Sequence, residues 1–203
     1  MKKVKFILLI ILIIPILGLA QSLENLDYIS PFHNGYAAIK KDNQWAFINT
    51  EGAIAIDFRN DLVARTVGDV NYPMFSDDRC LIEELKEGIS YFGYIDTFGK
   101  TVIKPQFLNA TNFSEGSSIA LKLVKEIVGE NEALVKNIVY YRYFEVTIDI
   151  EGNVINYLTP KGKNVVLDKE FLTYPPEIMS KQISKNVFAI KGKGNRWTII
   201  NNK

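Results

Sequence analysis

The chain has almost none of the side chains that build disulfides and soft-metal sites. Its 203 residues include one cysteine, Cys80, and one histidine, His33. A single cysteine excludes an intramolecular disulfide, and one cysteine with one histidine is too few for a tetrahedral zinc site. We therefore expect packing alone to stabilise the fold, and we expect no cofactor. With 47% hydrophobic and 12% aromatic residues, the chain has ample material for a core.

A surplus of basic charge is also missing. The formal net charge is +1 at pH 7, and it falls to −2 without the three lysines at the N-terminus. Proteins that bind nucleic acids or acidic lipid present an excess of lysine and arginine. The sequence therefore predicts no nucleic-acid partner.

The longest hydrophobic run lies at the N-terminus. Lys2, Lys3 and Lys5 precede FILLIILIIPILGLA, which is about fifteen residues and shorter than the roughly 20 that a membrane helix needs. Gly18 and Ala20 are the small residues that signal peptidase favours. The pattern predicts a signal peptide over 1–20, cleavage after Ala20, and a periplasmic or extracellular bacterial protein with no stable membrane span. An uncleaved anchor is the alternative.

A motif recurs about every fifty residues after this segment. Its copies are WAFINTEG from Trp45, FGYIDTFG from Phe92, EVTIDIEG from Glu145 and WTIINN from Trp197. In each copy an alternating strand runs into Asn49, Asp96, Asp149 or Asn201, and in three copies a glycine follows three positions later, at Gly52, Gly99 and Gly152. An Asp or Asn that bonds its own backbone, followed by a glycine with positive φ, is typical of a tight hairpin turn. Returning strands are therefore predicted over 53–56 and 100–103.

A second motif precedes each of these copies. It reads FHNGYAAIK from Phe32, FSDDRCLIE from Phe75, FSEGSSIAL from Phe113 and ISKNVFAIK from Ile183. Three residues after the apolar lead residue come Gly35, Asp78, Gly116 and Asn186, which are the residue types that best tolerate a left-handed backbone. A short strand follows in every copy.

These spacings predict one all-β domain over 21–203, made of tandem antiparallel hairpins and meanders. Its four imperfect units span about 28–74, 75–112, 113–157 and 158–203. We expect an open array of strands, with propeller-like closure as the alternative.

The segment FGYIDTFGKTVIKPQFLNATNFSEG, residues 92–116, resembles the WG repeat found in many bacterial proteins of mostly unknown role. Trp45, Phe92 and Trp197 occupy the aromatic position of that repeat, and Gly93 occupies the glycine position. Glu145 departs from the aromatic. Ala46, Val146 and Thr198 depart from the glycine. The resemblance implies a β-repeat fold and carries no catalytic residues.

When the units are aligned, the residues best suited to catalysis or metal binding fall at positions that have a structural explanation. Cys80 shares its position with Ala37, Ser118 and Phe188, which indicates a buried strand position. His33 aligns with serines, so we expect a solvated turn residue. Asp77 and Asp78 lack the spaced oxygen ligands of a calcium loop, and Asp78 falls on the left-handed position. No catalytic, cofactor-binding or metal site is predicted, and the ligand-binding residues are not identified.

The aromatic residues and two irregular segments each allow more than one structural or functional interpretation. Trp45, Phe47, Phe92, Tyr94 and Trp197 share one face of equivalent strands, where core packing is favoured over a sugar-stacking platform. The insertion VKEIVGENEALVKNIV predicts a long hairpin with its tip at Gly129–Asn131, or a short helix over 130–137. Residues 157–182 predict irregular coil with one strand.

The function favoured by these features is an exported, non-catalytic binding or interaction module, with a protein or a cell-envelope glycan as partner. One alternative is a cell-envelope or polysaccharide hydrolase whose carboxylates converge from different units. Such an enzyme requires two carboxylates about 5 to 10 Å apart in one cleft. A structural envelope protein is the other alternative.

Overall fold

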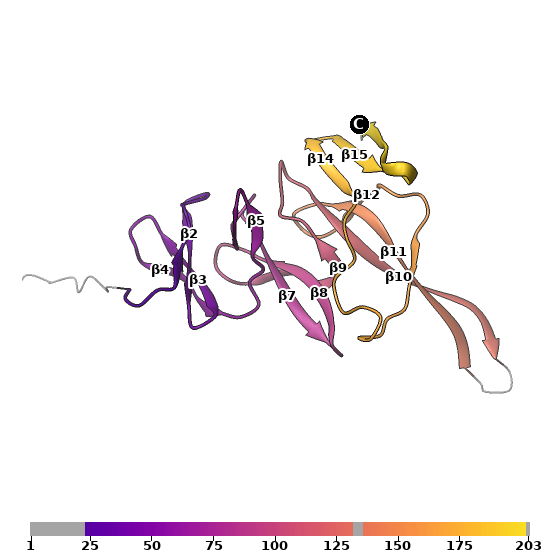
Figure 1. The fold of residues 1–203 in the computed structure, drawn as a ribbon, viewed down its shortest axis with the longest axis horizontal. Helices are drawn as coiled ribbons and strands as arrows, with labels where there is room; N and C mark the ends of the chain where they lie inside the picture. The colour runs from indigo at the N-terminus through magenta and orange to yellow at the C-terminus, as the bar shows by residue number, and fades with distance from the viewer. Residues whose placement is uncertain (1–22, 132–135, 202–203) are drawn as a thin grey trace, which may run out of the picture.

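The computed structural model describes residues 23–131 and 136–201, and this part of the chain is nearly all β. It contains sixteen strands, one 3-10 turn (η1, Lys193–Asn195) and no α-helix (Figure 1). The all-β prediction is therefore confirmed. The predicted signal peptide, residues 1–20, lies outside the described residues.

The first unit forms a four-stranded antiparallel sheet in chain order. Its strands are β1 (Tyr28–Ile29), β2 (Tyr36–Lys41), β3 (Gln44–Asn49) and β4 (Ile54–Arg59). A small hairpin of β5 (Arg65–Val67) and β6 (Val70–Tyr72) follows. The returning strand predicted over 53–56 is β4.

The second and third units share one seven-stranded antiparallel sheet. Its strands are β7 (Cys80–Lys86), β8 (Ile89–Ile95), β9 (Thr101–Ala110), β10 (Ser118–Asn131), β11 (Lys136–Ile148), β12 (Val154–Tyr157) and β13 (Lys163–Val165), which pairs with β11. Along β9, Ile103 pairs with Tyr94 of β8 while Ala110 pairs with Ala120 of β10. The single strand β9 thus pairs with the second unit at its start and with the third unit at its end.

The fourth unit is a three-stranded sheet of β14 (Ser180–Ser184), β15 (Val187–Lys191) and β16 (Trp197–Asn201). Figure 1 shows the sheets following one another along the long axis in an open row, with β14 and β15 beside the far end of the seven-stranded sheet. The array is open, so propeller-like closure is not the architecture.

The three predicted Asp/Asn turns are confirmed. In the second unit, Asp96 Oδ1 accepts hydrogen bonds from the backbone N–H groups of Phe98 (3.0 Å) and Lys100 (2.9 Å), and Gly99 has φ 78°. Asn49 and Asp149 bind their own turns in the same way. Although partial burial alone would raise the pKa of Asp149, hydrogen bonds from Asn153 and the turn amides lower it overall.

Three of the four turns that open the units have the backbone form favoured in two-residue hairpins. Both central residues have positive φ in the pairs Asn34–Gly35, Asp77–Asp78 and Glu115–Gly116, as a type I′ turn requires. The fourth turn joins Ser184 to Val187, and Asn186 is not among the positive-φ residues of the described chain. The left-handed conformation predicted for Asn186 is therefore wrong.

Gly93 explains the glycine position of the second unit. A Cβ atom added there would lie 2.3 Å from the carbonyl oxygen of Ile103 and 2.6 Å from the nitrogen of Pro105. The register between β8 and β9 shifts at this point, which brings the two backbones together. Glycine at this position therefore allows the two backbones to approach closely.

The insertion in the third unit is a long hairpin of β10 and β11, as predicted, but its predicted tip is wrong. Gly129 pairs with Ile138 and Asn131 pairs with Lys136, so Gly129–Asn131 belongs to a strand. Residues 130, 131, 136 and 137 are extended, which argues against the alternative helix. Residues 132–135, between the strands, lie outside the described residues.

The segment after β12 contains one strand before β14, as predicted, yet it does more than connect units. Its apolar residues Val165, Leu167, Leu172 and Ile178 pack against the buried cluster of Ile89, Leu108 and Leu121. Asn109 Nδ2 also donates a hydrogen bond to the Pro176 carbonyl oxygen (2.9 Å). We call residues 163–179 the strap, because they cover one face of the large sheet.

Candidate functional site

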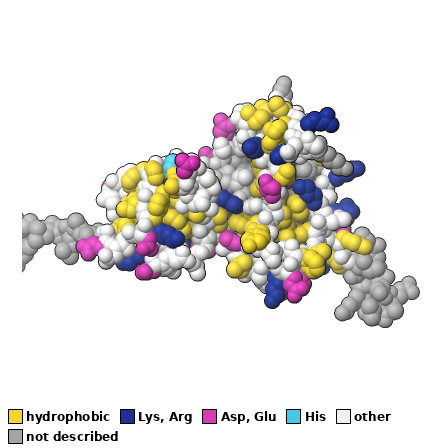
Figure 2. Space-filling model, in the orientation of Figure 1, with side chains coloured by type: hydrophobic (Ala, Val, Ile, Leu, Met, Phe, Trp, Pro, Cys, Tyr) yellow, Lys and Arg dark blue, Asp and Glu magenta, His cyan; other side chains and the backbone are white. Residues whose placement is uncertain are grey.

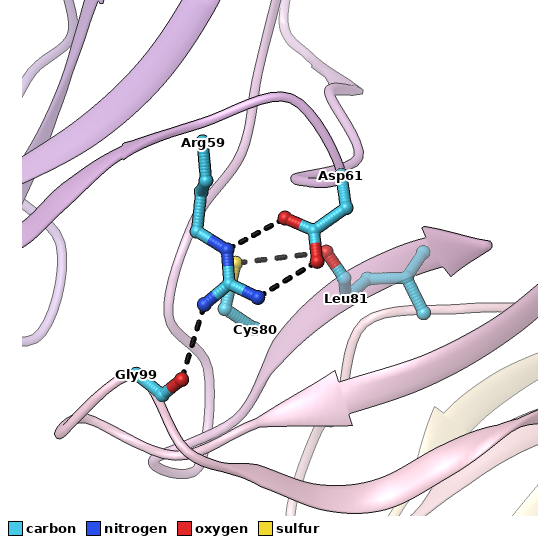
Figure 3. A network of polar contacts seen from close by, with 5 residues as sticks. All are labelled: Arg59, Asp61, Cys80, Leu81 and Gly99. Carbon is cyan, nitrogen blue, oxygen red and sulfur yellow. Dashed lines mark hydrogen bonds and ion pairs between the residues drawn. The ribbon is translucent and has the colours of Figure 1, made fainter.

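Cys80 lies inside the junction between the first and second units. It is 1% exposed on β7, so the predicted buried strand position is confirmed. Figure 3 shows the Arg59 guanidinium close by, held by Asp61 through bonds of 2.6 and 2.7 Å and donating to the Gly99 carbonyl oxygen at 3.1 Å. Burial raises the pKa of the Cys80 thiol well above its usual range, outweighing the nearby cation. A thiol in this setting is a poor nucleophile at neutral pH.

His33 is more constrained than the predicted solvated turn residue. Its Nε2 atom lies 2.8 Å from the Tyr72 hydroxyl, and its ring stacks on the Tyr72 ring with centroids 5.7 Å apart. His33 therefore fixes the β5–β6 hairpin against the first unit.

Asp77 and Asp78 also serve the contact between units. Asp78 has φ 57°, and Asp77 Oδ2 accepts a 2.7 Å hydrogen bond from the Gly116 amide of the next opening turn. Ser76 Oγ likewise donates to the Phe113 carbonyl oxygen, and Asn34 Nδ2 donates to that of Phe75. Within the described residues, no group of three or more histidine, cysteine or acidic side chains is arranged to hold a metal ion.

Most of the aromatic stripe is core, as predicted. Phe47, Phe92 and Tyr94 are at most 2% exposed. Trp197 is the exception: it is 44% exposed, with the Lys181 and Lys191 ammonium groups 5.4 and 5.8 Å from its ring centroid. The prediction of a core position is wrong for Trp197, because no described strand covers that face of β16.

The first two junctions between units are closed by pairs of aromatic rings. At the first junction, the lead residue Phe75 packs on Tyr36 and Phe47 with centroid distances of 5.0 and 4.7 Å. At the second junction, the lead residue Phe113 packs on Tyr94 at 4.7 Å. Phe75 and Phe113 are at most 1% exposed. A lead phenylalanine therefore enters the preceding unit at both places.

The last junction, between the third and fourth units, inverts this arrangement. Thr147 stands where the earlier units have Phe47 and Tyr94, and Phe188 stands where they have Cys80 and Ser118. The large side chain of the pair therefore belongs to the following unit at the last junction, whereas at the earlier junctions it belongs to the preceding unit. The lead residue, Ile183, lies at a register shift in β14 and is 58% exposed, so it does not enter the preceding unit.

A cavity of about 130 Å³ remains at the last junction, which we call the junction cavity. Two of its lining residues, Ser117 and Thr147, align with Tyr36 and Phe47, the residues that contact Phe75 at the first junction. The hydroxyl oxygens of Ser117 and Thr147 are buried and have no hydrogen-bond partner in the described chain. Buried polar groups are nearly always paired, so two unpaired hydroxyls are an unusual feature of this junction.

The rest of the junction cavity is lined by polar and apolar residues together, and it opens to solvent. Asn156, Asn186, Glu115 and Lys185 contribute amide, carboxylate and ammonium groups, and Phe188 and Ile155 contribute hydrocarbon. Asp77, which aligns with Glu115, binds the amide of the following turn. Glu115 makes no such bond to the fourth unit in the part of the chain that is described, so its carboxylate remains available to a ligand.

The repeat geometry agrees with the comparison with known families. The family model for the WG containing repeat matches residues 25–45 and 92–122. The chain therefore contains WG repeats over these two segments. No curated protein and no solved structure matches it. The second match covers Gly93, the turn at Asp96–Gly99, and Phe113, which is the lead residue of the second junction.

Glu145 shows how the third unit departs from its neighbours. It occupies the aromatic position, is 1% exposed, and its carboxylate accepts hydrogen bonds from the amides of Met179 (3.1 Å) and Ser180 (2.9 Å). A carboxylate in place of Trp45 or Phe92 thus holds the end of the strap, immediately before the fourth unit.

The residues of the junction cavity were not identified from the sequence. Aligning Thr147 with Phe47 and Tyr94 would have revealed the missing ring, since Phe188 already stood out as large in a column of small residues. The bulge that turns Ile183 outward and the path of the strap depend on tertiary packing. No WG repeat pattern encodes them.

Proposed function

We propose that this WG repeat protein is an exported, non-catalytic binding module whose binding site is the junction cavity. The observation that carries the proposal is the cavity itself, which remains where the last junction lacks the aromatic rings that fill the earlier ones.

The other residues suited to catalysis or metal binding already have structural roles in the array. Cys80 is buried, His33 bonds to Tyr72, and Asp77 bonds to Gly116. The junction cavity itself contains one carboxylate among its described lining residues, Glu115. A glycosidase would need two facing carboxylates in the cleft, so the lining favours binding over hydrolysis.

Other features of the described surface fit this role. On the face drawn in Figure 2, acidic and basic side chains are interspersed without a continuous basic track. No described helix is long and apolar enough to cross a membrane. Export itself rests on the N-terminal sequence pattern, and intact-mass analysis of protein from the native host would test it: loss of residues 1–20 is expected, and their retention would contradict export with cleavage.

The binding site is tested by covering the cavity mouth. Asn156 is half-buried on β12, and Asn156→Trp places a large ring at the rim without altering the core. Asn71→Trp, at an exposed position of β6, is the matched control. Wild type and both variants, purified from the full chain, are used to capture material from an envelope extract of the native host.

We expect Asn156→Trp to lose the captured partner and Asn71→Trp to retain it. Replacing residues 126–136 with a short Gly-Ser turn tests the competing location, the long hairpin. Loss of the partner on trimming the hairpin, with full retention by Asn156→Trp, would move the site away from the junction. Hydrolysis of an envelope polymer, abolished by replacing a single carboxylate, would overturn the non-catalytic role.

A further inference from the structure

We infer that copies of this chain associate head to tail, with the first unit of one copy stacked on the fourth unit of another. This inference goes beyond the proposed function and does not depend on what the junction cavity binds. It follows from two exposed apolar patches, from their buried equivalents at the first two junctions, and from the charges of the two units.

The first unit exposes large apolar residues at positions that the second unit buries. Its lead residue, Phe32, is 50% exposed, and Ile29 on β1 is 58% exposed. The equivalent residues of the second unit are the lead residue Phe75 and Leu62, whose bridge to β7 corresponds to the pairing of Ile29 with β2. Phe75 and Leu62 are 0% and 6% exposed, because they pack against the first unit. We call Ile29 and Phe32 the entry patch.

The fourth unit exposes the other side of such a junction. Ile199 occupies the position of Phe47 and Tyr94, the rings that receive the lead phenylalanine of the next unit. Phe47 and Tyr94 are buried, whereas Ile199 is 66% exposed. Trp197 lies two residues earlier on the same face of β16 and is 44% exposed. We call Trp197 and Ile199 the exit patch.

The two patches correspond to the two sides of one junction. At the first junction, Phe75 and Leu62 share a buried cluster with Phe47, so the entry patch of one copy fits the exit patch of another in the same arrangement. Terminal repeats of soluble arrays ordinarily present polar outer faces, and exposed apolar patches mark interaction sites. Figure 1 shows the first and fourth units at opposite ends of the row, so the patches meet between copies.

The charges of the two units favour the same contact. Residues 180–201 contain five basic residues and no acidic residue, and the Lys181 and Lys191 ammonium groups lie over the Trp197 ring. Residues 23–74 contain seven acidic and four basic residues, and Glu24 and Asp27 come just before the entry patch. Opposite charges favour contact between a first and a fourth unit, and like charges disfavour contact between two fourth units.

The test is the oligomeric state of the protein, expressed with its N-terminal segment and purified as the cell processes it. A head-to-tail contact does not close, so sedimentation from about 1 μM to about 1 mM should show masses that grow beyond a dimer. Phe32→Asp and Ile199→Asp should each raise the dissociation constant at least about tenfold, because each places a charge in an apolar contact. Phe98→Asp, on a turn outside both patches and 89% exposed, is the matched control and should leave association unchanged.

Mixing the two single variants distinguishes a head-to-tail contact from a symmetric one. Phe32→Asp keeps its exit patch and Ile199→Asp keeps its entry patch, so one contact between them remains possible. The mixture should form dimers and nothing larger, at a concentration where each variant alone is monomeric.

Several outcomes would overturn the inference. Wild type that stays monomeric up to about 1 mM would exclude self-association of useful strength. Association that is lost in Ile199→Asp but kept in Phe32→Asp would assign the contact to a symmetric pair of fourth units. Association that survives both substitutions would place the contact elsewhere. Urea melts establish that each variant is folded, and Ile29→Asp takes the place of Phe32→Asp if that variant is not.

Discussion

The first two junctions and the last junction use the same backbone positions with opposite distributions of side-chain volume. In the first two, a ring at Phe47 or Tyr94 faces a small residue and a buried lead phenylalanine. In the last, Thr147 faces Phe188, and the lead residue points to solvent. At the last junction, close packing is retained around Phe188 and lost around Thr147.

This difference distinguishes fully packed junctions from the junction to which we assign the proposed binding site. A junction in which every polar group and every ring has a partner stabilises the two units that it joins. The last junction keeps one polar link, from Gln182 Nε2 to the Ser114 carbonyl oxygen at 3.0 Å, and leaves two hydroxyls free. The proposed binding site lies where a repeat departs from its own pattern.

The largest expected difference between the junctions concerns their lead residues. Phe113 is 1% exposed against Tyr94, so Phe113→Ala should reduce the free energy of unfolding by about 3 to 5 kcal/mol. Ile183→Ala at the last junction should change it by less than about 0.5 kcal/mol, because Ile183 is exposed. Urea melts compare the two variants. Equal losses would mean that Ile183 enters the junction as phenylalanine does elsewhere.

The buried carboxylate beside the last junction should have the next largest effect. Glu145→Ala leaves the Met179 and Ser180 amides without their partner, so we expect a loss of about 2 to 4 kcal/mol. Glu84→Ala, on exposed β7 positions, is the control and should cost little. Hydrogen exchange at Met179 and Ser180 should rise in the Glu145 variant. Unchanged exchange there would show that Glu145 does not hold the strap.

The turn glycine at the first junction allows a test of backbone conformation. Gly99 has φ 78°, and a Cβ there would meet Ile56 at an ordinary 3.6 Å, so strain rather than collision decides the outcome. Gly99→Val should cost more than about 1 kcal/mol, and Gly99→Asn should cost less, because asparagine tolerates the left-handed region. Indistinguishable urea melts for the two variants would contradict the assigned turn.

The smallest expected effects come from removing a single hydroxyl at each kind of junction. Tyr94 Oη bonds to Ser118 Oγ and to the Thr111 carbonyl oxygen, both at 2.7 Å, so Tyr94→Phe should destabilise by about 1 kcal/mol. Thr147→Val should stabilise by about 1 kcal/mol, because it removes a buried hydroxyl without a partner. Chemical melts of the ligand-free protein should show opposite signs. A loss in both variants would indicate that Thr147 is already satisfied.

The sequence predicted the parts of the fold that depend on local backbone chemistry. Asp96 and Gly99 fix a turn through contacts within a few residues, and the turn appears as expected. The predicted tip of the long hairpin is wrong because Gly129 suggests a turn, whereas the two strands continue to pair beyond Gly129. The junction cavity was missed because it depends on which distant side chains fail to meet, and Thr147 is unremarkable in isolation.

The central claim, that the last junction is an inverted form of the others, is tested most directly by transplanting the second-junction pair into it. Thr147→Tyr, Phe188→Ser and the double variant are compared with wild type in urea melts. We predict that each single variant loses stability, through overpacking or through a cavity, and that the double variant recovers at least about 2 kcal/mol relative to the sum. Strictly additive losses would contradict the account, because they would show that Thr147 and Phe188 do not share one space.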